Sequence, residues 1–165
     1  DKGMVNFTMT GHVAAPTDTA IVTPTYDSTV PAPLIGVPFT VGGYSSVINS
    51  LNFDMGTTIS TPADIAAADG YGEIRITAYK PAGSFDPENV LIATNDYYGD
   101  WVAGTSLALT TGLIGGTAGN RVKVDMPAIV YTDVSHADRD GLATLEAPFV
   151  AVDSSGDDFV SIAYT

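Results

Sequence analysis

The chain has 165 residues, of which 45% are hydrophobic, and this size and composition suit one globular domain. It contains no cysteine, so these residues form neither a disulfide scaffold nor a zinc–thiolate site nor a thiol enzyme. The net charge is −13 with only six lysine and arginine residues, which disfavours binding to nucleic acid through its phosphates.

The first half of the chain predicts short strands separated by turns. The strands are expected at 5–10, 21–25, 39–41, 50–55 and 73–79, where apolar and polar residues alternate or β-branched residues gather. A turn is expected at 14–18, an irregular proline-rich segment at 27–38, and a loop or single helical turn at 61–70. In the strand at 50–55, Leu51, Phe53 and Met55 are expected to face the core.

The middle of the chain has a different pattern, which predicts one or two short helices within 86–103. Asp86 can cap a helix that has Pro87 in its first position. Gly99 weakens the middle of such a helix, and Gly104 can end it.

The C-terminal part of the chain predicts an uninterrupted series of strands. Four are expected, at 120–126, 129–134, 142–152 and 159–165. Acidic turns are expected at Asp138-Arg139-Asp140-Gly141 and at 153–158. The whole pattern predicts a mainly β chain, an antiparallel sandwich or barrel-like domain with one or two short flanking helices.

Two motifs near the turn expected at 138–141 resemble chemical sites but lack required residues. His136, Asp138 and Asp140 have the spacing of the first ligands of an EF-hand, but Ala147 stands where a bidentate glutamate is needed. Ser135 and His136 are adjacent on a predicted strand, so they point to opposite faces and cannot act as a hydrolase pair. The sequence therefore predicts no catalytic residue, no metal ligand and no cofactor.

Two alternatives remain open from the residues themselves. Tyr97, Tyr98 and Trp101 could form the aromatic platform of a β-sandwich carbohydrate-binding or adhesion module, provided that the rings are exposed and coplanar. Burial of Trp101 in the core would remove that alternative. The many acidic residues suggest a glycosidase, which would require two facing carboxyl groups about 5–9.5 Å apart in a cleft.

Two long stretches, 28–53 and 102–120, contain no charged residue. A monomeric protein usually spreads charge over its surface, so these stretches suggest a surface that other copies of the chain cover. Polar loops rich in glycine, serine and threonine would explain them equally well.

A resemblance to a known family extends over nearly the whole chain. It rests on Asp138 to Gly141 and on five further segments, which follow in order at 10–18, 43–56, 93–98, 118–120 and 154–158. Together they resemble the C-terminal half of the tail tube proteins (major tail proteins) of long-tailed phages. Members of that family are usually longer at the N-terminus, so a leading segment is expected in the parent protein.

The resemblance implies a β-sandwich or barrel-like subunit with a flanking helix. Six copies would form a ring, and stacked rings would form the tube through which DNA leaves the capsid. The expected partners are the chain itself and other tail proteins, with no membrane, and the expected location is the virion tail after assembly in the host cytoplasm. Acidic groups on the lumen would repel DNA within about 8 Å and let it pass without specific binding. The residues expected at the contacts between copies are Tyr44, Tyr97, Tyr98, Asp138, Arg139 and Asp140.

Overall fold

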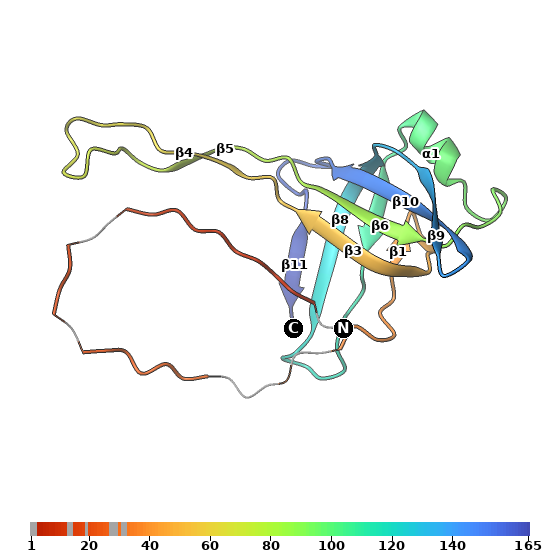
Figure 1. Cartoon of the computed structure of the whole chain (residues 1–165), viewed down its shortest axis with the longest axis horizontal. Helices are drawn as coiled ribbons and strands as arrows, with labels where there is room; N and C mark the ends of the chain where they lie inside the picture. The colour runs from red at the N-terminus through yellow and green to blue at the C-terminus, as the bar shows by residue number, and fades with distance from the viewer. Residues whose placement is uncertain (1–2, 13–14, 19, 27–29, 31–32) are drawn as a thin grey trace.

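The computed structural model describes residues 3–12, 15–18, 20–26, 30 and 33–165. Its elements surround one core and leave a long two-stranded arm that projects from it (Figure 1). The strands are β1 Thr40–Val41, β2 Tyr44–Ser45, β3 Ile48–Asp54, β4 Thr58–Ser60, β5 Arg75–Ala78, β6 Ala82–Pro87, β7 Leu107–Thr110, β8 Val122–Tyr131, β9 Ser135–Arg139, β10 Leu142–Ala151 and β11 Ser161–Tyr164. The helix α1 is Tyr97–Ala103. The chain is therefore mainly β with one short helix, as the sequence predicts.

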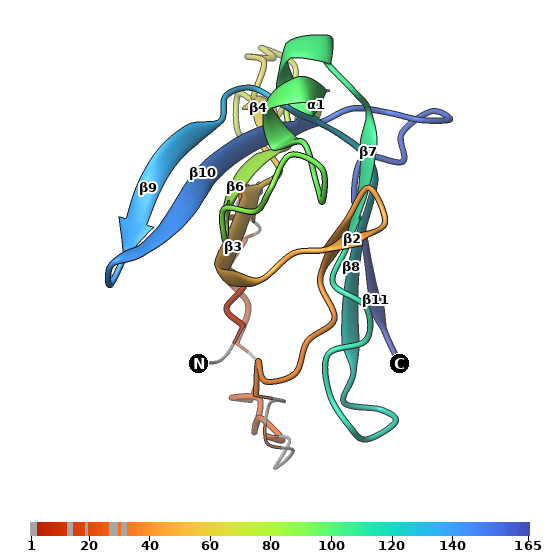
Figure 2. The same ribbon diagram turned by 90° about the vertical axis from the view of Figure 1, so that its right-hand side faces the viewer.

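The main sheet is antiparallel and curls around the core. Its strand order is β2-β1-β7-β8-β10-β6-β3, while β11 pairs with β8 and β9 pairs with β10. β4 and β5 form a separate two-stranded sheet. β2 and β3 stand at opposite ends of the strand order, yet the chain passes from Ser45 directly to Ile48. This short connection brings the two ends of the sheet close together, so the sheet has the barrel-like form that was expected (Figure 2).

β8 is one strand where the sequence predicts two, at 120–126 and 129–134. Pro127 interrupts the pattern because it has no N–H group to donate to a neighbouring strand. The sheet accommodates it with a bulge: Leu107 of β7 pairs with Ile129, whereas Leu109 pairs with Met126. β8 therefore continues through the proline instead of ending before it.

β10 connects the two parts of the sheet. Its second half pairs with β8, where Tyr131 lies opposite Phe149, and its first half pairs with β9, where Ser135 lies opposite Glu146. Between these pairs the N–H of Thr132 donates to the carbonyl of Pro148 at 2.9 Å, so β8 and β9 follow one edge of β10 around a bulge. β6 occupies the other edge (Figure 2).

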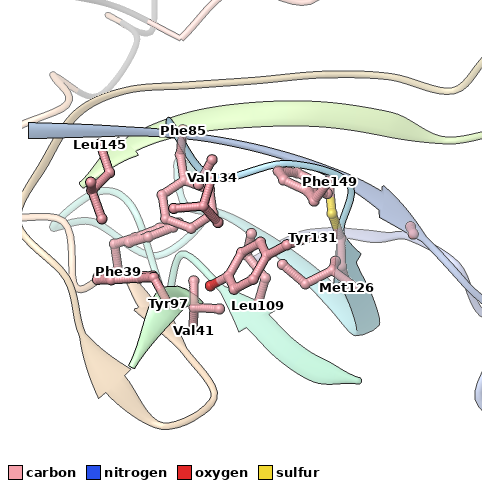
Figure 3. Close-up of a cluster of buried hydrophobic side chains, with 13 residues drawn as sticks. Phe39, Val41, Phe85, Tyr97, Leu109, Met126, Tyr131, Val134, Leu145 and Phe149 are labelled. Atoms are coloured by element: carbon pink, nitrogen blue, oxygen red, sulfur yellow. The ribbon is translucent and has the colours of Figure 1, made fainter. Parts of the chain in front are cut away.

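The core consists of large apolar side chains from both ends of the sheet (Figure 3). Phe85 has a central place, with its ring centroid 5.3 Å from that of Phe39 and 6.1 Å from those of Tyr131 and Phe149. Such tilted aromatic pairs bury much apolar area in few residues. Other fully buried side chains are Leu109, Met126, Ile129 and Leu145. Leu51 and Phe53 pack against this core as predicted, but Met55 lies beyond the end of β3 and is partly exposed.

The strands predicted at 5–10 and 21–25 do not form. No strand precedes Thr40 among the residues that the structure describes. Alternating side chains form a strand only where the edge of another strand lies beside them, and within the described residues no strand pairs with these two segments. The predicted turn at 14–18 and the irregular segment at 27–38 each include residues outside the described ranges.

One short helix lies within the predicted range 86–103, but it begins at Tyr97 and is not capped by Asp86. Asp86 and Pro87 belong to β6 and do not start a helix. The carboxylate of Asp86 accepts hydrogen bonds from the N–H groups of Asn49 and Ser50, at 3.0 and 2.7 Å, where the register of β3 shifts. Thus the acidic residue stabilises a strand irregularity across the sheet instead of a helix terminus.

Candidate assembly surfaces

The arm is the first surface that the single chain leaves incomplete. β4 and β5 extend from the body and pair only with each other among the described residues (Figure 1). Ile59 lies opposite Ile76, and both remain about half exposed. Further exposed apolar side chains along the arm are Ile65, Tyr71 and Tyr79. A two-stranded sheet is at best marginally stable in water, so this apolar face requires a covering surface.

The base of the arm is narrow because Gly56, just after β3, lies against the backbone that joins β5 to β6. A Cβ atom at Gly56 would lie 2.3 Å from the carbonyl oxygen of Lys80, and the φ angle of Gly56 is 54°. Only glycine fits such a contact with that backbone conformation. The sequence therefore fixes where the arm leaves the body.

The acidic turn between β9 and β10 is a second exposed surface. Arg139 pairs with Leu142, so Asp140 and Gly141 form a two-residue loop with φ angles of 54° and 83°. Positive φ at both positions is typical of a type I′ turn, which suits the twist of a hairpin. Asp138 accepts the N–H of Gly141 at 3.1 Å, and this bond stabilises the turn. The turn predicted at 138–141 is confirmed.

Arg139 fixes the position of this hairpin on the body of the molecule. Its two terminal nitrogens lie 3.1 Å from Asp86 and 3.1 Å from Glu88. Asp86 also holds the irregular backbone of β3 through its other oxygen. The guanidinium group therefore links β9 to β6 and, through Asp86, to β3.

Arg139→Ala is expected to lower the free energy of unfolding by about 1 kcal/mol, because two partly buried carboxylates lose their shared partner. Arg139→Lys should restore less than half of this loss, since one ammonium group cannot match two separate carboxylates as the guanidinium fork does. The control is Arg75→Ala, which removes a pair with Glu73 on the exposed arm and should change stability little. Urea unfolding measures all three. An equal effect of Arg75→Ala would contradict this role of Arg139.

Helix α1 is held against the body by its aromatic residues. The indole N–H of Trp101 donates to the carbonyl of Thr132 at 3.0 Å. The hydroxyl of Tyr98 lies 3.1 Å from Nε2 of His136, and that of Tyr97 lies 2.8 Å from the hydroxyl of Ser46. Burial raises the pKa of Tyr97, and the bond with Ser46 opposes that rise.

These contacts argue against the aromatic platform, which was one of the alternatives left open by the sequence. Tyr97 is buried in the core, and Tyr98 and Trp101 pack against it. A sugar-binding platform needs coplanar rings that face solvent, and these three rings serve packing instead. The carbohydrate-binding alternative therefore loses the observation on which it rested.

The ends of α1 are explained by two glycines and one acid. Asp96 caps the helix by accepting the N–H of Gly99 at 2.8 Å. A Cβ atom at Gly99 would lie 2.3 Å from that carboxylate, so the glycine that the sequence marks as a weakness is needed for the cap. Gly104 ends the helix in the left-handed conformation, as predicted.

Tyr131 carries the one buried side-chain polar atom that lacks a hydrogen-bond partner among the described residues. Burial is the main cause that raises the pKa of its hydroxyl, and Tyr97 and Asp100 add to the rise. Tyr131→Phe is expected to increase the free energy of unfolding by about 1 kcal/mol, because an unsatisfied buried hydroxyl is removed. Tyr97→Phe breaks the bond to Ser46 and should decrease it by a similar amount. Thermal unfolding of the two variants tests this opposite pair of signs, and destabilisation by Tyr131→Phe would contradict it.

The structure distributes the six residues expected at contacts between copies over different environments. Asp138 and Asp140 are exposed at the β9–β10 turn, with Arg139 partly buried between them. Tyr44 and Tyr98 are partly buried, and Tyr97 belongs to the core. Their part in assembly stays a prediction. Ile59 and Ile76 were not among these six residues, because a local sequence pattern can show that a strand has an apolar face but not what covers that face.

Residues 33–165 and the shorter described ranges before them contain no group of three histidine, cysteine or acidic residues that could hold a metal ion. No helix in the described part of the chain is long and apolar enough to span a membrane.

The fold can be compared with that of known proteins. The sequence matches no protein-family model, and no curated protein sequence is significantly similar to it. Among solved structures, the anti-feeding prophage cap, described as a tube-terminating cap, is similar with a TM-score of 0.54 and 15% identity over 84% of this chain and 96% of that one. The tail of an empty GTA particle has a TM-score of 0.47 and 8% identity over 73% and 83% of the two chains. An Hcp protein has a TM-score of 0.35 and 10% identity over 73% and 77%. The chain therefore has the fold of the tube-terminating cap, a fold that agrees with its resemblance to tail tube proteins.

Proposed function

We propose that this chain is a structural subunit of a phage-type tail, which assembles with copies of itself into stacked six-membered rings. The rings form the tube through which DNA is ejected. The observation that carries the proposal is the arm: on a fold shared with a tube-terminating cap, a two-stranded sheet exposes Ile59 and Ile76 with nothing in the described chain to cover them.

The open borders of the main sheet support the same proposal. β2 and β3 end the strand order, and each has one edge without a partner strand in the described residues. Unpaired edges of soluble monomers are usually blocked, because they attract other strands. In a closed ring each copy would cover the edge of its neighbour, and cyclic symmetry would leave no edge open.

The charge of the chain is compatible with a passive tube. A net charge of −13 repels the phosphates of DNA, and salt limits the repulsion to about 8 Å. Only carboxylates that face the lumen would therefore act on the passing DNA. Their role would be to prevent adhesion of the DNA, which needs no base-specific contact.

Negative-stain electron microscopy of the purified protein tests the proposal. Hollow tubes or stacked rings with six-fold symmetry are the expected result. A protein that stays monomeric at all concentrations and salt conditions would contradict it.

A second role is favoured by the similarity to the tube-terminating cap, which covers almost all of that protein. As a cap, the chain would form a single ring that binds the end of a tube made of another protein. The same micrographs separate the two roles, because a tube subunit grows into tubes of variable length, whereas a cap stops at one ring.

A further inference from the structure

Residues 4–10 have a strand sequence without a strand partner. Val5, Phe7 and Met9 alternate with Asn6, Thr8 and Thr10. The exposed fractions of Val5, Phe7 and Met9 are 58%, 77% and 88%. No backbone hydrogen bond joins residues 3–12 to another segment among the described residues. Burial of such side chains is worth about 1.5–3 kcal/mol each, so a surface that accepts this row would gain considerable free energy.

The composition of the segment limits the kind of partner. Residues 3–12 contain no lysine, arginine, aspartate or glutamate. A segment selected for nucleic acid or for an anionic membrane would carry basic residues. A neutral segment with two different faces instead suits the open edge of a protein sheet.

The outer edge of β3 offers both matching faces. On one face, Leu51 lies opposite Phe85 and both pack into the core. On the other face, the Asn52 side chain donates to the hydroxyl of Ser84 at 3.1 Å. A strand added beyond β3 would need apolar side chains on the first face and polar side chains on the second. The alternation of apolar and polar residues in 4–10 meets this requirement.

The segment is directed away from β3 of its own chain. His12 lies within hydrogen-bond distance of Asp69, in the loop that joins β4 to β5. This contact lowers the pKa of the Asp69 carboxyl. Residues 3–12 accordingly run from the body toward the far end of the arm (Figure 1). A second copy is therefore the source of the edge.

We propose that residues 4–10 of one copy add as a strand to the outer edge of β3 in a second copy. Val5, Phe7 and Met9 then extend the apolar face of the neighbour. The inference rests on the proposed self-assembly, and it specifies which segment is exchanged and which edge accepts it.

Disulfide cross-linking can test the pairing, because the chain has no cysteine of its own. One preparation carries Asn52→Cys. It is mixed in turn with differently tagged preparations that carry single cysteines at positions 5 to 10, and each mixture is oxidised. Neighbouring strands bring Cα atoms within the 4.4–6.8 Å that a disulfide needs, and only residues on the same face can react.

The expected result is a heterodimer whose yield alternates with position. It should be at least about fivefold higher for cysteines at the polar positions 6, 8 and 10 than for those at 5, 7 and 9, since Asn52 lies on the polar face. Uniform yields, or no heterodimer above the level of single-cysteine controls, would overturn the pairing. A further mixture combines Asn52→Cys with Thr77→Cys on the arm. A higher yield of heterodimer from this mixture than from the cysteines at positions 6, 8 and 10 would overturn the pairing as well.

Two matched substitutions provide a second measurement. Phe7→Asp should weaken self-association at least about tenfold, whereas Thr8→Asp adds the same charge on the polar face and should have less than a threefold effect. Sedimentation velocity measures both. Equal effects would overturn the proposal. If tubes form but there are no cross-links and Phe7→Asp acts no more strongly than Thr8→Asp, the strand exchange is wrong while the tail function stands. If no assembly occurs and no cross-link forms, the strand exchange and the proposed tail function are both wrong.

Discussion

Ile76→Asp is expected to abolish self-association while the body of the protein stays folded. Ile76 and Ile59 form the exposed apolar pair of the arm, and the main sheet does not include either residue. A carboxylate in a surface that becomes buried on assembly loses its hydration without gaining a partner. The dissociation constant should rise at least about 100-fold, which corresponds to about 2.7 kcal/mol. Analytical ultracentrifugation gives the oligomeric state, and circular dichroism gives the fold.

Thr77→Asp is the matched control for this prediction. Thr77 is the next residue of β5 and points to the opposite face, where it donates a hydrogen bond to the carbonyl of Thr58 at 3.3 Å. The substitution Thr77→Asp adds the same charge to the same strand as Ile76→Asp does. If Thr77→Asp disrupts assembly as strongly as Ile76→Asp, general repulsion explains the loss and the apolar face of the arm is not the contact.

Gly83→Ala is expected to lower the free energy of unfolding by about 3 kcal/mol or more. A Cβ atom at this position would lie 2.3 Å from the carbonyl oxygen of Asn52 and 2.7 Å from the ring of Phe149. The first contact is with the backbone of β3, so β3 and β6 must separate before alanine can fit. Overpacking of a core usually costs about 1–3 kcal/mol, and a clash with backbone lies at the upper end of that range.

Gly116→Ala is the control for Gly83→Ala. Gly116 has no atom within 4 Å of an added Cβ, and its φ angle is not in the left-handed region. Alanine there should change stability by less than about 0.5 kcal/mol. Urea unfolding of both variants measures the difference. A Gly83→Ala protein as stable as the original would show that β3 is not held against β6 as described.

The sequence predicted the elements whose side chains alternate within a covered sheet. The fold class, β10, the turn at Asp140 and Gly141, and the end of α1 at Gly104 are confirmed. In these places the local sequence agrees with the tertiary structure. The apolar face of β10 packs against the core, and the positive φ angles occur at glycine and aspartate residues, which tolerate them.

The wrong predictions share one physical cause, which is that the partner of a group was not visible in the local sequence. Asp86 followed by proline has the chemistry of a helix start, but its carboxylate is occupied by Asn49, Ser50 and Arg139 from distant strands. Likewise, the alternation around Ile76 predicts a strand with an apolar face, yet β5 lies outside the main sheet and Ile76 remains about half exposed. Local pattern predicts that a strand has an apolar face, but not what covers that face.

The position of β10 has a consequence for how fast the chain folds. β10 joins β6, β8 and β9, and its pairing of Ala147 with Phe85 links residues far apart in the sequence. Closing such large loops costs entropy before any contact compensates for it, so β proteins of this kind fold in milliseconds to seconds. Nascent chains therefore spend a long time with apolar strands uncovered. Mutual repulsion between chains of net charge −13 would keep these intermediates apart and protect them from aggregation.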